Sequence, residues 1–275
     1  MENEQRKKHR LRQKRNGRKL IVTVYIVLRL MVLMTMFSQL LNKNYENVYI
    51  CLLTLVLFML PSFAQRRLRI SLPDTLEIVI LIFIFAAEIL GEIQDYYHKI
   101  PWWDTLLHTV NGFLFAAIGF SVVSILNEDK ALIKRLSPFY MAVMAFCFSM
   151  TIGILWEFFE WGMDSWFGFD MQKDTVISRF VSSRLTGLEE LEIYHLDDVI
   201  LICDDGTQVR LMIGGYLDLG LHDTMMDMLV NFVGAAIFSL LGYFYVKTDS
   251  KGRFACKFIP RVNDSSTHEW SAEDG

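Results

Sequence analysis

Runs of about 20 apolar residues are the feature that most limits what this chain can fold into. A helix rises 1.5 Å per residue, so about 20 residues cross a hydrocarbon core about 30 Å thick. The chain is 53% hydrophobic with a mean hydropathy of +0.31, which is too apolar for an ordinary soluble domain. We therefore predict an all-α polytopic membrane protein with six transmembrane helices. The expected spans are residues 20–42, 47–64, 74–94, 104–126, 138–161 and 222–246.

Basic residues gather at alternate connections between these runs. Nine of the first 19 residues are Lys or Arg. Further basic residues follow the second, fourth and sixth runs: Arg66, Arg67, Arg69, Lys130, Lys134, Arg135, Lys247, Lys251 and Arg253. Short cytosolic loops carry an excess of Lys and Arg, so both termini are expected in the cytosol. This sorting of charge indicates membrane orientation and gives no sign of a nucleic-acid partner.

The same pattern divides the chain into segments. The apolar stretch after the basic N-terminus is too long for a secretory signal and lacks a cleavage site, so we expect an uncleaved first span.

The four cysteines lie far apart in sequence and predict no disulfide framework. The expected order is a basic cytosolic N-terminus (1–19), helices one to five (20–164), an outward loop (165–221), helix six (222–246) and a disordered cytosolic tail (247–275).

The long outward loop predicts a small β-rich cap. Residues 192–195, 199–204 and 208–213 read as short strands. Asp205-Gly206 is a hairpin turn signal, because glycine tolerates the positive φ of tight hairpins. Two strands alone are marginally stable, so the cap is expected to dock over the outer face of the helices. The alternative is a solvated connector.

Four apolar segments carry polar side chains at helical spacing, all toward the outer end of the predicted spans. Residues three or four apart share one helix face. An ionisable group in a span costs roughly 2.5–3.5 kcal/mol on insertion scales, so such groups usually face a bundle interior or a wet cavity. The four stripes therefore predict one shared polar site at the outer leaflet. They are Glu88, Glu92 and Asp95; Asp104, His108 and Asn111; Glu157, Glu160 and Asp164; and Asp223, Asp227 and Asn231.

Carboxylates and a histidine drawn from several helices are the ligand set of metal sites in helix bundles. The predicted cofactor is a divalent cation, Mg²⁺, Mn²⁺ or Zn²⁺. The predicted metal ligands are His108, Glu157, Asp227, Asp104 and Asp223, with Glu160 or Asp164 as general base. Asp104 and Asp223 also suit capping of a helix N-terminus, and this role is expected as readily as metal binding.

Three other interpretations of the stripes stay open. Coupled carboxylates and histidine also form proton or cation pathways, with Glu88, Glu157 and Asp227 titrating as substrate passes. Alternatively, the polar groups hydrogen-bond helices together, at roughly 0.6 kcal/mol on average. A third class is a membrane scaffold of an envelope complex, with the long outer loop as its docking surface.

Two further features have a structural interpretation. Arg29 is the one basic residue inside an apolar run, and we expect it to snorkel inward or to pair with Glu77. Several glycines in the expected spans suit close helix packing rather than phosphate binding. They are Gly112, Gly119, Gly153 and Gly234.

Four segments together resemble a known family. They are WDTLLHTVNGFLFAAIGF (103–120), GILWEFFEWGMD (153–164), DMQKDT (170–175) and DTMMDMLVNFVGA (223–235). The chain resembles the YjdF-like family of bacterial inner-membrane proteins and, more distantly, the VanZ-like family associated with glycopeptide resistance. Shared elements are an Asp-x-x-x-His opening a span, a Trp-Glu pair ending a later one, and an Asp-x-x-x-Asp/Asn before a small-residue Gly-Ala. The functional candidates carried over are Asp104, His108, Trp156, Glu157, Asp174, Asp223 and Asp227.

The resemblance implies a multi-pass protein of the bacterial cytoplasmic membrane, and it implies no reaction. The chain departs from the family in its longer loop between the last two spans and in Asn231, deeper in the last span. Together, the resemblance and the stripes support the hypothesis of metal-dependent hydrolysis or modification of a lipid-linked or cell-envelope substrate.

Overall fold

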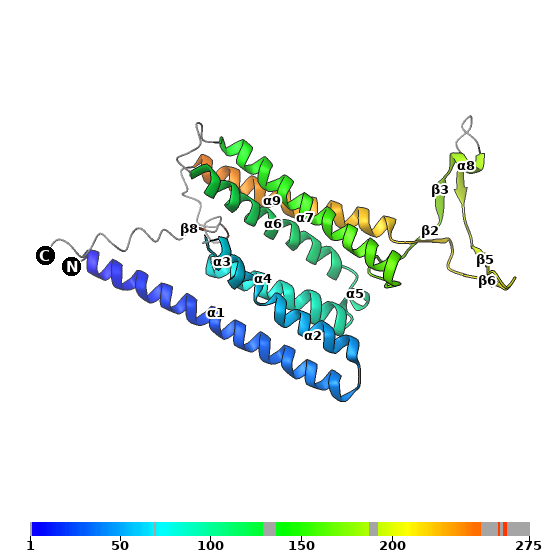
Figure 1. Cartoon of the computed structure of the whole chain (residues 1–275). Coiled ribbons are helices and arrows are strands. Elements are labelled where there is room, and N and C mark those ends of the chain that lie inside the picture. Colours follow the sequence, from blue (N-terminus) through cyan, green and yellow to red (C-terminus); the bar gives the residue numbers. More distant parts are fainter. Residues whose placement is uncertain are drawn as a thin grey trace. The chain divides into compact units, whose positions relative to one another are not determined.

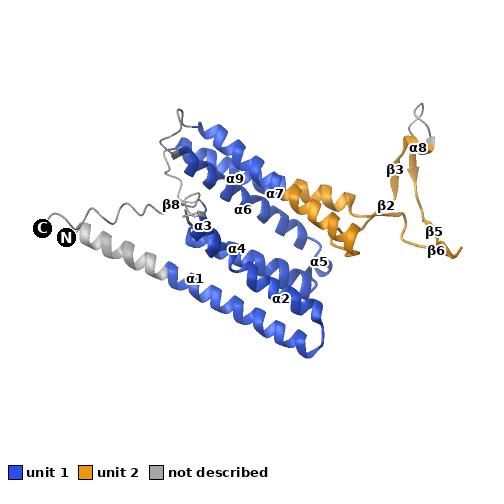
Figure 2. Cartoon of the chain, viewed as in Figure 1, with its two compact units in different colours: residues 1–152, 230–275 blue, residues 153–229 orange. Residues whose placement is uncertain are grey.

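The computed structural model describes residues 2–68, 70–128, 136–186, 192–248, 258 and 261–262. The chain forms two compact units (Figures 1 and 2). Unit 1 comprises residues 1–152 and 230–275, and unit 2 comprises residues 153–229. Both divisions fall inside long helices, α7 and α9.

Long helices make up most of unit 1. Local signals set several of their ends: Asn44 accepts a hydrogen bond from the Asn47 amide at 3.2 Å and so caps α2, and Pro138 is the first residue of α7. The helices are α1 (Glu2–Leu41), α2 (Tyr45–Leu57), α3 (Leu60–Leu68), α4 (Asp74–Phe85), η1 (Ala86–Ile93), α5 (Tyr96–Lys99), α6 (Trp103–Glu128) and the parts of α7 (Pro138–Phe167) and α9 (Leu221–Lys247) that belong to this unit.

Among the described residues, five helical stretches are long and apolar enough to cross a membrane. They are Gly17–Leu41, Tyr45–Arg67, Trp103–Asn127, Pro138–Phe167 and Leu221–Lys247. These match five of the six expected spans and confirm a mostly helical chain with several apolar helices. The expected third span, residues 74–94, is not among the five. It is helical, but it is divided between α4 and η1.

The η1 segment is a π-helix. Its end is marked by the Gln94 amide, which donates to the carbonyl of Ile89, five residues earlier, at 3.0 Å. Asp95 then adopts a positive φ of 60° and stops the helix. A π-helical turn shifts the side chains that follow it relative to an α-helical register. Sequence periodicity at three and four residues does not reveal this shift, so the uniform helix expected for 74–94 is wrong in this detail.

Unit 1 contains two apolar cores. The first joins α1, α2, α4 and η1, and its most buried members include Val32, Cys51 and Leu81. The second joins α4, α6, α7 and α9, around Phe120 and Phe238. Many large apolar side chains on the long helices stay exposed within the described chain. This distribution is expected of helices whose outer faces meet lipid rather than water.

Glycines allow α6 and α9 to approach closely. A Cβ on Gly112 would lie 2.1 Å from the Asn231 carbonyl oxygen, and one on Gly234 would lie 2.0 Å from the Thr109 carbonyl oxygen. Each glycine therefore lies directly against the backbone of the other helix. A Cβ on Gly119 would likewise lie 2.8 Å from the Phe148 side chain of α7. The predicted packing role is confirmed for these three glycines.

Part of the tail predicted to be disordered has a defined place. Strand β8 (Arg261–Val262) pairs antiparallel with β1 (Ile70–Ser71). Phe258 is buried in the second core, with its ring centroid 5.3 Å from that of Phe113. The sequence did not predict this contact, because a short segment with few apolar residues is a weak pattern. Most of 247–275 lies outside the described residues.

Unit 2 contains the end of α7, the start of α9 and short antiparallel hairpins. Strand β2 (Thr175–Ile177) pairs with β7 (Tyr216–Asp218), and β3 (Arg179–Val181) pairs with β4 (Ile193–His195). Strand β5 (Ile200–Ile202) pairs with β6 (Gln208–Arg210) across a turn in which Gly206 has a φ of 83°. A short helix, α8 (Ser183–Thr186), follows β3.

The three strands expected from the sequence are confirmed as β4, β5 and β6, and the Asp205-Gly206 hairpin is correct. Strands β2, β3 and β7 were missed. Asp198 closes the base of the hairpin, because its carboxylate accepts from the Arg210 side chain and from the Met212 amide at 2.7 Å. These contacts lower the pKa of Asp198, with the Arg210 bond as the largest cause.

The reciprocal glycine contact yields a stability prediction. Gly234→Ala should lower the free energy of unfolding by about 1–3 kcal/mol, because the new methyl group must displace the α6 backbone. Thermal unfolding of the detergent-purified protein measures the loss. Gly162→Ala is the matched control, since its Cβ would lie 3.3 Å from the movable Trp166 ring. Equal melting temperatures for both variants would contradict the close contact.

Candidate functional site

Helix α6 places Asp104 and His108 one turn apart at its beginning. The His108 Nε2 lies 3.5 Å from an Asp104 carboxylate oxygen. His108 is buried, whereas Asp104 is half-buried. A carboxylate beside an imidazole fixes the ring's orientation and tautomer, which is the usual environment of a metal-binding histidine. The predicted Asp-x-x-x-His stripe thus forms a real pair.

Asn111 and Asn231 meet where α6 and α9 are closest. Asn111 donates to the Asn231 side-chain oxygen at 3.4 Å, and Asn231 donates to the Met150 sulfur at 3.6 Å. Ser149 of α7 donates to the Gly112 carbonyl at 2.7 Å. Asn231 is only 1% exposed. These bonds tie three helices together, so the two asparagines serve as a polar support rather than as part of the carboxylate group.

Two groups of three side chains have ligand atoms that all lie within 4.8 Å of one another. One is Asp104, His108 and Asp227, and the other is His108, Glu157 and Glu160. All but Asp104 are buried. The groups share His108, whose imidazole carries two nitrogens. The two groups contain five residues from three predicted stripes, and we call these five residues together the His108 cluster.

Glu160 receives a partner that the sequence did not reveal. The Trp156 indole N–H donates to one Glu160 oxygen at 2.8 Å, one helical turn away on α7. The family resemblance had marked Trp156 as a functional candidate without giving it a role. The bond fixes the Glu160 carboxylate and satisfies one of its oxygens. A carboxylate held in this way is oriented for a ligand or a proton.

Asp164, one of the two predicted general bases, lies against the loop that follows α7. Its two oxygens accept from the backbone amides of Met171 and Gln172, at 2.7 and 2.8 Å. It therefore holds the loop that follows α7. Both oxygens are engaged by backbone donors, which favours a structural role over proton transfer. Among the described residues, Asp164 belongs to neither group of the His108 cluster.

Asp223 anchors the same loop from α9. Its carboxylate accepts from the Lys173 amide at 2.7 Å, and Gln172 donates to Thr224. The cap of α9 comes instead from Asp218, whose carboxylate accepts from the His222 amide at 2.6 Å. Asp218 was not singled out from the sequence, because Leu219 and Gly220 separate it from the start of α9.

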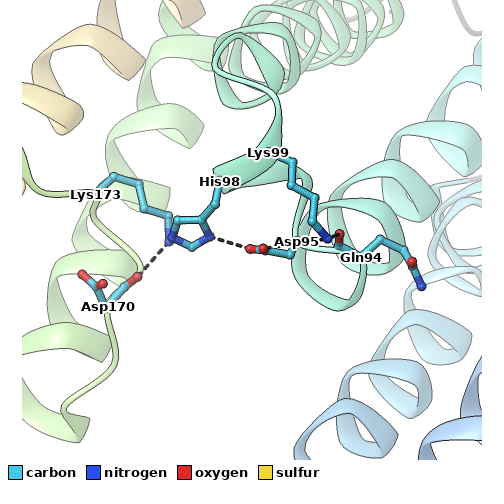
Figure 3. A network of polar contacts seen from close by, with 6 residues as sticks. All are labelled: Gln94, Asp95, His98, Lys99, Asp170 and Lys173. Carbon is cyan, nitrogen blue, oxygen red and sulfur yellow. Dashed lines mark hydrogen bonds and ion pairs between the residues drawn. The ribbon is translucent and has the colours of Figure 1, made fainter.

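Asp174 lies in the acidic surroundings of this loop. Asp174 is exposed, and its pKa is raised, first by desolvation and then by the charges of Asp170, Asp164 and Asp218. A raised pKa makes this carboxylate easier to protonate and lowers the stability of the folded state slightly at neutral pH. Lys173 donates to the Asp170 carbonyl at 2.9 Å, as drawn in Figure 3.

The first predicted stripe lies in and just after the π-helix. Glu88 and Glu92 belong to η1, and Asp95 ends it. Asp95 contacts the His98 ring at 2.6 Å, and Lys99 donates to the Gln94 carbonyl at 2.7 Å (Figure 3). Glu88 and Glu92 belong to neither group of the His108 cluster within the described chain. The contacts at the end of this stripe are therefore made among residues 94–99.

Arg29 and Glu77 make contacts other than the expected pair. Arg29 lies over the Tyr25 ring, 5.1 Å from its centroid. Glu77 accepts from the Gln65 amide at 3.2 Å. Arginine stacks readily on an aromatic ring because its guanidinium is planar and weakly hydrated. The pairing of Arg29 with Glu77 stays a prediction.

Comparison with known proteins gives one match. A family model described as Predicted membrane protein (DUF2238) matches residues 22–248. This match covers most of the chain, including every residue of the His108 cluster, and it is the family that the YjdF-like resemblance indicated. The chain matches no curated protein and no solved structure.

The loop contacts of Asp164 yield a prediction for local opening. Asp164→Ala removes two acceptors from the Met171 and Gln172 amides, and hydrogen bonds to a charged group contribute about 1.5–3 kcal/mol each. Both amides should exchange with solvent at least roughly tenfold faster. Hydrogen exchange followed by mass spectrometry measures this rate. Asp170→Asn is the control, because the hydrogen bond from the Lys173 ammonium is accepted by the Asp170 backbone carbonyl, which the substitution leaves in place. Unchanged exchange in Asp164→Ala would contradict the anchoring role.

Proposed function

The chain belongs to the DUF2238 family of predicted membrane proteins, and from that premise we propose that it is a divalent-metal-dependent enzyme of the bacterial cytoplasmic membrane. In this proposal both termini lie in the cytosol and the His108 cluster faces the outer leaflet. The substrate is a lipid-linked or other cell-envelope molecule. The distant VanZ-like resemblance supports an envelope substrate.

One observation carries the proposal, which is the buried His108 cluster. The His108 cluster places four carboxylates and one imidazole in a largely apolar helix bundle, and the carboxylates repel one another if they are ionised. Taking such charges out of water costs several kcal/mol per ion unless they are paired. A divalent cation bound among them offsets this cost and explains why the side chains converge.

The donor set favours certain ions. Each group of three combines one imidazole with two carboxylates. Imidazole suits Zn²⁺ and other transition metals, whereas Mg²⁺ prefers oxygen ligands and retained water. We therefore expect Zn²⁺ or Mn²⁺ to bind more tightly than Mg²⁺. His108, Glu157 and Asp227 are the proposed ligands, and Asp104 orients the His108 ring.

The proposed chemistry follows from the same residues. A bound divalent cation polarises a phosphoryl or carbonyl oxygen and makes water more acidic. Glu160 is the proposed general base, because the hydrogen bond from Trp156 orients its carboxylate within the His108 cluster. Asp164 and Asp223 hold the loop after α7 and do not enter the reaction. This assignment revises the roles expected from the sequence.

Metal content tests the proposal. The purified protein, reloaded with Zn²⁺ or Mn²⁺ and then dialysed, should retain close to one ion per chain. His108→Ala and Glu157→Gln should each lose it, because both remove a ligand. Elemental analysis measures the ratio. Glu88→Gln is the control, since Glu88 lies outside the His108 cluster, and it should retain the ion. A wild-type protein that retains none after reloading would exclude the metal site.

One observation favours a second candidate, a proton- or cation-coupled transporter. Glu88 and Glu92 lie in the π-helix η1, and π-helical turns are frequent at functional sites. Uptake into proteoliposomes driven by a proton gradient would detect transport. In that case Glu88→Gln should abolish uptake while leaving metal content unchanged. Retained uptake in Glu88→Gln would remove the support that η1 gives to this candidate.

A further inference from the structure

Arg29 places a positive charge near the middle of an apolar helix. Residues 20–41 of α1 lie within Gly17–Leu41, a helical stretch long and apolar enough to cross a membrane. The midpoint of 20–41 falls between Leu30 and Met31. At 1.5 Å per residue, Arg29 is therefore about 2 Å from that midpoint and about 14 Å from residue 20 along the axis. An ionisable side chain at this depth is costly unless it has a polar partner.

Tyr25 holds the Arg29 side chain against α1. The guanidinium carbon lies 5.1 Å from the centroid of the Tyr25 ring, which is one helical turn closer to the N-terminus. The Tyr25 hydroxyl lies 3.4 Å from the Ser62 hydroxyl of α3, and this contact orients the ring. Even at the level of Tyr25, the charge stays about 8 Å inside residue 20 at 1.5 Å per residue. The stacking contact therefore keeps the guanidinium within the apolar stretch.

Arg29 makes no ion pair in the part of the chain that the structure describes. Its side chain is exposed, and its contact is with the face of the Tyr25 ring. Glu77 is 8% exposed and accepts from the Gln65 side chain at 3.2 Å. A guanidinium carries five N–H donors. Donors placed in hydrocarbon need acceptors, so Arg29 indicates a partner from outside the chain.

The face of α1 that carries Arg29 is otherwise apolar and exposed. Residues three or four apart share one face of a helix. On this basis the Arg29 face contains Val22, Ile26, Leu33, Phe37 and Leu40, all of them exposed. Val32, by contrast, is fully buried in the core that joins α1, α2, α4 and η1. Arg29 thus lies on the outer side of α1, in the middle of a continuous apolar surface.

We propose that the Arg29 face binds a transmembrane helix of another protein, one that carries a carboxylate near the centre of the bilayer. The guanidinium donates to that carboxylate, and the exposed apolar side chains pack against the partner helix. A planar guanidinium fits a carboxylate through two parallel hydrogen bonds. The interaction is independent of the proposed metal chemistry, because Arg29 lies outside the His108 cluster.

Depth and charge favour this occupant over the alternatives. A lipid phosphate lies outside the hydrocarbon core, whose half-thickness is about 15 Å, and it reaches a guanidinium at this depth only if the bilayer thins. Two copies of α1 that met through this face would place two arginines side by side, and like charges repel. On a second copy, Glu77, Glu157 and Asp227 are themselves buried. A carboxylate from a different protein meets both requirements.

Designed transmembrane peptides test the proposal. Each peptide is a helix of about 20 leucines in which the central residue is Asp, Leu or Lys. The labelled full chain and one labelled peptide are placed in phosphatidylcholine vesicles, and fluorescence energy transfer measures binding. The Asp peptide should bind at least roughly fivefold more tightly than the Leu peptide, the worth of one interhelical polar contact. The Lys peptide should bind no better than the Leu peptide. Equal binding of the Asp and Leu peptides would overturn the proposal.

Variants assign the preference to one side chain. Arg29→Leu and Arg29→Gln should each abolish the preference for the Asp peptide over the Leu peptide. Arg29→Asp should reverse the charge preference and bind the Lys peptide best. Arg66→Gln is the matched control, because Arg66 is an exposed arginine near the end of α3, and it should bind the peptides as the wild type does. Melting temperatures show which variants are folded.

Three further results would overturn the proposal. The first is a preference for the Asp peptide that persists in folded Arg29→Leu. The second is loss of the wild-type preference when phosphatidylglycerol is added to the vesicles, which would assign Arg29 to an anionic headgroup. The third is a wild-type dimer, detected by cross-linking in the vesicles, that Arg29→Leu abolishes, which would assign the Arg29 face to a second copy of the chain.

Discussion

The cost of placing carboxylates on apolar helices shapes this protein more than any other single constraint. Each ionisable group in hydrocarbon must find a partner, a cavity or a cation. His108, Glu157, Glu160 and Asp227 meet this requirement together, whereas Asp164 and Asp223 meet it by accepting backbone amides of one loop. Within unit 1, the close contact at Gly112 and Gly234 brings the backbones of α6 and α9 together.

The periodicity of apolar and charged residues was sufficient to predict the long helices and many of the site residues. Runs of about 20 apolar residues predicted the long helices, and three- and four-residue spacing predicted which side chains share a face. Asp104, His108, Glu157, Glu160 and Asp227 could therefore be selected before their distances were known. The Asp205-Gly206 turn was also predictable, because a positive φ at the second position strongly favours glycine.

Other features depend on contacts that no local pattern encodes. Asp164 and Glu160 occupy the same stripe, yet one anchors a loop and the other faces His108, and only the path of residues 168–173 decides between them. The π-helical register of η1 was missed because a hydrophobic segment of this length fits an α-helix equally well. Strands β2 and β7 are three residues each and lie about 40 residues apart, so their pairing has no signal in either segment alone.

Cysteine cross-linking tests the convergence of the stripes most directly. In a background with the four native cysteines replaced, His108→Cys is combined with Glu157→Cys in the membrane-embedded protein and treated with Hg²⁺, which bridges two nearby thiols. The account predicts an intramolecular bridge, because the ligand atoms of His108 and Glu157 lie within 4.8 Å. The control pair joins His108→Cys with Leu155→Cys, an exposed position on another face of α7, and should not bridge. Bridging in the control alone, or in neither pair, would contradict a shared site.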